Sequence, residues 1–267
     1  MKKVLILLLS IVGMACQKPL PREKQNEEKN RKVLMKNGIR FERAYNYEAG
    51  DTVHGKLVSV SEYDEKGRLT RRMNMSDNGR GPVNAVEDFS YNKDGKVEEV
   101  LYKTMLFISK IKYVYDAAGN NTERNVYTDS VLERRILMSY DKRGNIATME
   151  SLKEDKIDYR MEYTYNDFDE EASSKRIDAS GSERSSSKLL TRTDTSMRWE
   201  VRSEDGATQV ENLLDKNGNL ILIRNYKNGV ITGQTKYRYD ADNLLIEIHQ
   251  LSANNEEQLT RFKRSKD

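Results

Sequence analysis

YVYDAAGNN at residues 113–121 and MSYDKRGNI at residues 138–146 decide the fold of this chain, because the same phrase returns along most of its length. The phrase is an alternating run that ends in Tyr-Asp or Tyr-Asn, followed by two spacer residues and usually by Gly. Further copies are SEYDEKGRL at 61–69, FSYNKDGKV at 89–97 and LLDKNGNL at 213–220, and variants without the glycine occur at 163–171 and 237–245. A repeat at a fixed period indicates a chain built from one supersecondary unit.

The Asp or Asn of each phrase marks the register of the repeat. The marks are Asp64, Asn92, Asp116, Asp141, Asn166, Asp215 and Asp240, and most lie about 25 residues apart, as expected for a structural array. The longer gap after Asn166 predicts a degenerate unit at 189–201, in which Asp194 keeps the mark and Met197 replaces the glycine. The Ser-rich stretch 179–188 is interpreted as an expanded turn, and an incomplete unit is expected at 33–47.

Each unit is expected to contain two strands and two turns. In the run Ile111, Tyr113 and Tyr115 the apolar residues alternate with polar ones, which is typical of a half-buried strand. The unit length leaves about eight to ten residues for each strand, in the ordinary range. We therefore predict an all-β fold: a long antiparallel meander of about sixteen strands, twisted and curled into an open barrel or coiled sheet. Tyr and Met should fill the concave side, with Lys, Arg, Glu and Thr outside.

The Asp-x-x-Gly step has a physical reason. Asp at the first turn position can accept a hydrogen bond from the backbone two residues on, and Gly at the fourth accepts the left-handed conformation that closes the turn. Four pairs are assigned this structural role: Asp64 with Gly67, Asp116 with Gly119, Asp141 with Gly144, and Asp215 with Gly218. A calcium site at 215–219 is disfavoured, because no bidentate carboxylate follows at the required spacing.

At YVYDAAGNN, MSYDKRGNI and YRYDADNLL the sequence resembles the YD repeat of Rhs and teneurin-type proteins, over residues 61–251. The resemblance implies repeats that wind into a β-shell, and carbohydrate binding has been attributed to such repeats. The period here is slightly longer, and only a short tail follows the array, so no enclosed toxin domain is expected. In this the chain is more similar to the short, free-standing YD-repeat lipoproteins of Bacteroidota-like bacteria than to the members that enclose a toxin domain.

The N-terminus indicates export. Lys2 and Lys3, an apolar run too short to span a bilayer, and small residues before the only cysteine form a signal peptide over residues 1–15. Its end resembles a lipoprotein signal, which implies acylation of Cys16; simple secretion after cleavage remains the alternative. Residues 16–32 are expected to form a flexible tether, residues 33–260 a single β-repeat domain, and residues 261–267 a basic tail. By the lipoprotein rule Gln17 favours the outer membrane.

Composition argues against several classes of function. Removal of residues 1–15, with Lys2 and Lys3, lowers the formal net charge from +3 to +1, and acidic and basic residues are interspersed, so no nucleic-acid partner is expected. His54 and His249 are the only histidines, and neither has metal-ligand spacing. No phosphate loop, nucleophile elbow or zinc-protease motif occurs. We expect no cofactor, no metal and no catalysis; an enzyme or enzyme accessory of cell-surface glycan metabolism is the alternative.

The aromatic residues are the candidate binding residues. Tyr115, Tyr140, Tyr165 and Tyr239 recur at one register and should form a ladder that is either core or a stacking face for a glycan or protein. Trp199, in the degenerate unit, is a further candidate contact. Asp51-Thr52 and Asp129-Ser130 resemble an O-glycosylation motif of Bacteroidota. The sequence thus predicts a lipid-anchored, non-catalytic envelope scaffold or binding module.

Overall fold

The computed structural model describes residues 21–48, 51, 53–75, 83–254 and 256–266. The predicted signal peptide and Cys16 lie outside the described residues. Within these residues the chain forms one helix, α2 (Pro21–Lys36), and eighteen strands. The first nine strands are β1 (Phe41–Tyr47), β2 (Lys56–Tyr63), β3 (Leu69–Met75), β4 (Val83–Tyr91), β5 (Val97–Thr104), β6 (Ile108–Tyr115), β7 (Asn121–Thr128), β8 (Val131–Tyr140) and β9 (Ile146–Lys153). The other nine are β10 (Lys156–Tyr165), β11 (Glu171–Asp178), β12 (Glu183–Arg192), β13 (Ser196–Ser203), β14 (Gly206–Leu214), β15 (Leu220–Lys227), β16 (Val230–Tyr239), β17 (Leu245–Ser252) and β18 (Glu257–Ser265).

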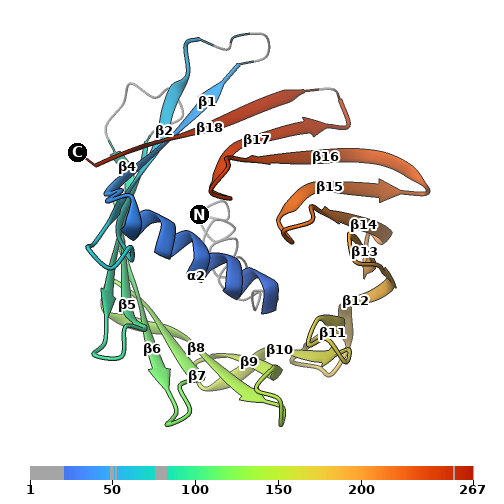
Figure 1. The fold of residues 1–267 in the computed structure, drawn as a ribbon. Helices are drawn as coiled ribbons and strands as arrows, with labels where there is room; N and C mark the ends of the chain where they lie inside the picture. The colour runs from blue at the N-terminus through green and yellow to red at the C-terminus, as the bar shows by residue number, and fades with distance from the viewer. Residues whose placement is uncertain (1–20, 49–50, 52, 76–82, 255, 267) are drawn as a thin grey trace.

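The strands form a closed antiparallel barrel (Figure 1). Every strand pairs with its neighbour in sequence, and β1 pairs both with β2 and with β18, so the sheet has no free edge. The predicted all-β antiparallel meander, curled on itself, is confirmed. The sheet closes completely, and it has eighteen strands instead of about sixteen. Closure removes the unpaired backbone groups that an edge strand would expose.

The extra strands come from the two ends of the array. The prediction of a basic tail over residues 261–267 is wrong for residues 261–265. These residues form the last part of β18, and they pair with Phe41–Tyr45 of β1. The tail therefore seals the barrel. Its Arg264 also forms an ion pair of 2.5 Å with Glu42 of β1, across the closing seam.

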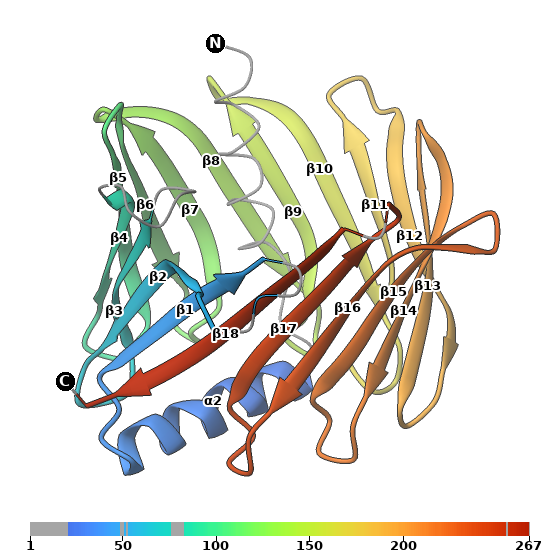
Figure 2. The ribbon, with the colours of Figure 1, turned by 90° about the horizontal axis from the view of Figure 1, so that it is seen from above.

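Helix α2 replaces the flexible tether expected over residues 16–32, which is a correction from Pro21 onward. It lies across one end of the barrel (Figure 2), with Leu34 buried and the backbone oxygen of Arg31 close to Gly67. Lys, Glu, Gln and Arg make the segment polar but are also strong helix formers, and Glu28 pairs with Lys32 one turn later at 3.0 Å. Low apolar content was therefore misread as flexibility. In the described part of the chain no helix is long and apolar enough to cross a membrane.

The two faces of the sheet differ in burial. Ile136, Met138, Met149 and Tyr159 share the face of the tyrosine register and form a buried cluster, with Tyr140 and Tyr163 packed against it. The opposite face carries cross-strand ion pairs such as Arg71 with Asp88 and Arg238 with Glu247. Since side chains converge on the concave side of a barrel, the buried tyrosine face is the interior and the charged face the exterior.

Two classes of turn lie at opposite ends of the barrel, because each unit contributes one strand in each direction. All Tyr-Asp turns occupy the end near α2, which we call the YD-turn end. In each, the Asp or Asn backbone and side chain close the turn: Gly144 N donates to Asp141 O at 3.0 Å, and Arg143 N donates to Asp141 Oδ1 at 2.9 Å. The φ of Gly144, 78°, is the left-handed conformation that the pattern predicted.

The degenerate unit is built differently from the prediction. Its turn runs from Thr193 to Ser196, whose backbone and hydroxyl groups bond to each other, so Asp194 does not hold the mark. Met197 is not a turn residue but a buried residue of β13. The Ser-rich stretch is not an expanded turn either: Asp178 and Gly181 form a tight turn of the Asp-x-x-Gly kind, and β12 begins at Glu183.

Candidate functional site

The tyrosines of the predicted ladder lie inside the barrel, where their hydroxyl groups form hydrogen bonds with the backbone. Each hydroxyl donates to the carbonyl of the first residue of the strand that follows the preceding Tyr-Asp turn. The bonds are Tyr91 to Leu69 O at 2.6 Å, Tyr115 to Val97 O at 2.7 Å, Tyr140 to Asn121 O at 2.6 Å, Tyr165 to Ile146 O at 3.0 Å and Tyr239 to Leu220 O at 3.0 Å. Each tyrosine therefore fastens its unit to the preceding one.

Burial extends the pH range over which these phenols stay protonated. Desolvation raises the pKa of Tyr115 to about 12, with nearby Tyr113 adding to the rise. Desolvation also raises the pKa of Tyr239 to about 12 and raises the pKa values of Tyr140 and Tyr165. A phenol that stays protonated remains a hydrogen-bond donor, as the ladder requires.

Arginine takes the tyrosine position in two units. In β18, Arg264 Nη2 donates to Leu245 O at 2.7 Å, which is the same acceptor position that the tyrosines use. In β12, Arg192 makes two bonds of 2.7 and 2.8 Å with the carboxylate of Glu170, whose side chain is 7% exposed. Such a fork-to-fork pair is directional and strong. The degenerate unit thus replaces a phenol-to-carbonyl bond with a buried ion pair.

Trp199 lies on the interior face, opposite Leu189 of β12 and Val210 of β14. It is half-buried and does not line either of the two recesses described below. The structure therefore does not bring Trp199 together with the tyrosines that shared its predicted role.

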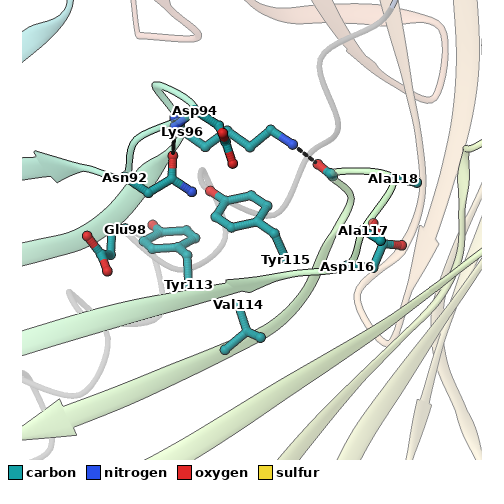
Figure 3. Close-up of a pocket in the computed structure, with 11 residues that line it drawn as sticks. Asn92, Asp94, Lys96, Glu98, Tyr113, Val114, Tyr115, Asp116, Ala117 and Ala118 are labelled. Atoms are coloured by element: carbon teal, nitrogen blue, oxygen red, sulfur yellow. Dashed lines mark hydrogen bonds between the residues drawn. The ribbon is translucent and has the colours of Figure 1, made fainter.

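A recess at the YD-turn end brings aromatic, basic and acidic side chains together (Figure 3). We call it the rim recess; its volume is about 580 Å³. It lies between the β4–β5 and β6–β7 turns. Its lining residues are Asn92, Asp94, Lys96, Glu98, Tyr113, Val114, Tyr115, Asp116, Ala117, Ala118 and Gly119.

Two aromatic rings and one cation shape the rim recess. Tyr113 and Tyr115 point to the same side of β6, opposite to Val114 (Figure 3). The Lys96 ammonium lies 5.3 Å from the centre of the Tyr115 ring and donates to Gly119 O at 2.8 Å. This hydrogen bond joins the β4–β5 turn to the β6–β7 turn, the two turns between which the recess lies.

Two carboxylates enter the rim recess without a partner among the described residues: those of Asp94 and Glu98. Asp94 is held by its backbone, since its N–H donates to Asn92 Oδ1 at 3.0 Å. The carboxylate of Asp116 is different: hydrogen bonds from the side chain and backbone of Asn120 lower its pKa. Aromatic rings beside carboxylates and an ammonium group offer the mixed apolar and polar contacts that sugar rings use.

A second recess, of about 810 Å³, lies on the exterior over β10 to β13. Small hydroxyl residues such as Ser173 and Ser186 form its floor, and Lys175, Lys188 and Arg202 stand among its walls. Arg202 is paired with Glu200 at 2.6 Å. This groove has no aromatic residue, so it offers fewer contacts to a sugar ring than the rim recess.

The histidines stand apart. His54 lies beside Asp51, with 3.2 Å between Nδ1 and Oδ2, and His249 contacts Glu257. Among the described residues no group of three or more His, Cys, Asp or Glu side chains could hold a metal ion.

The fold defines the chain as a closed, eighteen-stranded antiparallel barrel with a polar exterior. It is similar to a porin-like protein from Bacteroides uniformis, with a TM-score of 0.50 and 9% identity over 85% of this chain and 98% of that one. At this identity the likeness concerns the fold alone. A porin-like protein from Bacteroides vulgatus gives a TM-score of 0.32 and 8% identity over 67% of this chain and 93% of that one.

The comparison with a Photorhabdus luminescens Tc holotoxin pore gives a TM-score of 0.33 and 13% identity, over 81% of this chain and 14% of that one. This score is too low to carry an argument, so the YD-repeat resemblance stays a prediction from the sequence. No protein-family model matches the sequence. The search of curated proteins also gives no match.

The rim recess was missed by the sequence reasoning, although its parts were visible. Tyr115 was a candidate, but its partners Lys96, Asp94 and Glu98 lie in the preceding unit. Only the lateral spacing of the turns brings them together. A signal did exist: Lys96 occupies the position after the turn glycine, where Asn stands in three other copies, at Asn120, Asn145 and Asn219.

Proposed function

We propose that this chain is an exported, lipid-anchored, non-catalytic barrel of the cell envelope that binds a glycan through the rim recess. The observation that carries the proposal is the placement of Tyr113 and Tyr115 beside the ammonium of Lys96 and the carboxylates of Asp94 and Glu98, which have no partner in the described part of the chain. Sugars are bound by ring stacking together with hydrogen bonds to such groups. The barrel fold shared with a porin-like Bacteroides protein, and the N-terminal signal with Cys16, support the envelope location.

The test of binding is a glycan array followed by calorimetry with the best oligosaccharide. Asp94→Asn removes a carboxylate from the recess and keeps its shape, so we expect binding to weaken about tenfold, the usual effect of losing one charged hydrogen bond. Asp242→Asn is the matched control, because Asp242 has the same turn position and donates its N–H to Asp240 Oδ1 at 2.9 Å. Equal effects of the two variants, or no glycan bound, would refute the assignment.

One observation favours a second candidate. Glycoside hydrolysis uses two carboxyl groups, and the rim recess is lined by two carboxylates, those of Asp94 and Glu98, that have no partner among the described residues. A binding module releases its oligosaccharide unchanged, whereas a hydrolase shortens it. Product analysis of the bound oligosaccharide with the unaltered chain and with Glu98→Gln therefore separates the two functions: hydrolysis that disappears in the variant would establish the enzyme.

For the location, labelling with a palmitate analogue is the test. We expect label on the unaltered chain and none on Cys16→Ser. A variant that still labels would refute acylation at Cys16.

A further inference from the structure

Exposed aliphatic side chains gather at the end of the barrel opposite to the YD turns. Met105 and Leu106 form the tip of the β5–β6 loop and are 82% and 81% exposed, and Val131, after the β7–β8 turn, is 66% exposed. Ile108, Leu132 and Ile157 are also exposed and begin or continue the strands beside them. We call these six residues the apolar edge.

The apolar edge spans three loops that are neighbours around the barrel. The β5–β6 and β7–β8 loops are joined directly, since Asp129 N donates to Ile108 O at 2.8 Å and Asp129 Oδ1 accepts from Ile108 N at 3.1 Å. An ion pair of 3.3 Å between Arg135 and Asp155 links the β9–β10 turn to the same group. Exposed apolar side chains that gather in one region of a folded protein are a mark of an interaction site.

We propose that the apolar edge inserts into the surface of a lipid bilayer. Met105 and Leu106 stand on the tip of the β5–β6 loop, and the other four residues lie at the first or second position of their strands at the same end of the barrel. Neither recess is lined by any of the six, so the edge offers protrusions and not a groove. A deformable bilayer interface accepts such protrusions to a depth of about 5–10 Å. A protein partner would need matching cavities at several separate tips.

The backbone of the longest tip is already prepared for an apolar environment. Polar backbone groups that enter lipid need internal partners. The hydroxyl of Thr104 accepts from the N–H groups of Leu106 and Phe107, both at 3.1 Å, and Thr104 N donates to Phe107 O at 3.0 Å. The β5–β6 tip can therefore leave water without stranding these groups.

The charges beside the edge are mixed in sign. Lys153 and Lys156 flank Glu154 and Asp155 in the β9–β10 hairpin, and Arg135 is paired. The edge therefore needs no anionic lipid, and its binding should change little with salt, unlike the binding of a basic patch.

This contact is separate from acylation. Only four residues lie between Cys16 and Pro21, the start of α2, and this stretch reaches at most about 18 Å. Helix α2 lies at the YD-turn end, a strand length of about 27 Å from the apolar edge. With α2 in place, an acyl chain on Cys16 and the apolar edge would not enter the same bilayer, so the edge is tested without the acyl chain.

The experiment is sedimentation of the mature chain, residues 16–267 without the apolar signal peptide, carrying Cys16→Ser, with phosphatidylcholine vesicles. Leu106→Ser combined with Val131→Ser should lower the vesicle-bound fraction at least about tenfold, because each buried aliphatic side chain contributes roughly that factor. Phe168→Ser is the control: Phe168 is 73% exposed but lies in a YD turn, at the other end, and its loss should change nothing. Equal effects of the two ends would overturn the proposal.

A fluorescent probe gives an independent readout. Cys16→Ser leaves a chain without cysteine, so Leu106→Cys or Phe168→Cys can each carry a single polarity-sensitive dye. Vesicles should shift the emission of the dye at position 106 to the blue and leave the dye at 168 unchanged. Self-association that depends on the edge, without a spectral shift on adding vesicles, would make the edge a protein interface and refute the bilayer.

Discussion

The buried ion pair of the degenerate unit should be worth far more than an exterior one. Arg192→Met keeps the length of the side chain but removes both bonds to Glu170, whose carboxylate stays at 7% exposure without its cation. Breaking a buried pair by removing one partner costs about 3–5 kcal/mol. Because Arg192 itself is 17% exposed, we expect the lower value, about 3 kcal/mol.

Urea unfolding followed by circular dichroism measures this loss, and two variants interpret it. Arg184→Met breaks exterior pairs, including one with Glu204, where both partners are half or more exposed, so it should cost at most about 1 kcal/mol. The double variant Arg192→Met with Glu170→Gln removes the buried charge as well and should recover part of the loss. If Arg192→Met costs no more than Arg184→Met, the argument from burial is wrong.

Three further predictions concern the ladder, the turns and the seam. The pKa of Tyr115 is raised from 10.0 to about 12 in the folded chain, so the unfolded chain releases this proton first. The contribution of Tyr115 to the free energy of unfolding should therefore be fully present below pH 10 and be lost as the pH rises toward 12. Tyrosinate absorbance and circular dichroism, followed together against pH, measure this loss. In Gly144→Ala the added Cβ meets no atom within 4 Å, so the free energy of unfolding should fall only by the strain of a positive φ, about 1–2 kcal/mol. In Gly67→Ala the added Cβ also meets Arg31 O at 2.8 Å. This variant should release α2 from the barrel, which would be seen as faster hydrogen exchange in the helix. Arg264→Met should open the seam, so that amides of β1 and β18 exchange faster than those of β9 and β10; uniform exchange would contradict a specific role in closure.

The sequence predicted what is local. Alternation around Tyr113 gave the strands, and the Asp141 phrase gave the turn, because both depend on residues a few positions apart. The strand count and closure depended on distant partners: nothing in RFKRS at 261–265 says that it pairs with β1. The prediction of a flexible tether was wrong because a high content of charged residues was taken to indicate a disordered segment. The same residues favour a helix once Leu34 can be buried.

The candidate site was less predictable than the fold. A single copy of the phrase shows Tyr115 but not Lys96, because the two residues meet only when neighbouring units stand side by side. The hydroxyl bonds of the ladder were missed for the same reason. Arg192 was invisible as the tyrosine substitute, because the degenerate unit had been aligned on Asp194 and not on the residue that points inward.

Because each repeat unit has two strands, the two ends of the barrel can change independently of each other. Every Tyr-Asp turn faces one end and every intervening turn the other, while the hydroxyl bonds from Tyr91 to Tyr239 hold the wall between them. A substitution in one half of the repeat therefore alters one mouth of the cylinder and leaves its opposite untouched. The same array of strands can therefore acquire a binding site for a new ligand at one end and a new contact surface at the other, with no change in the order of its strands.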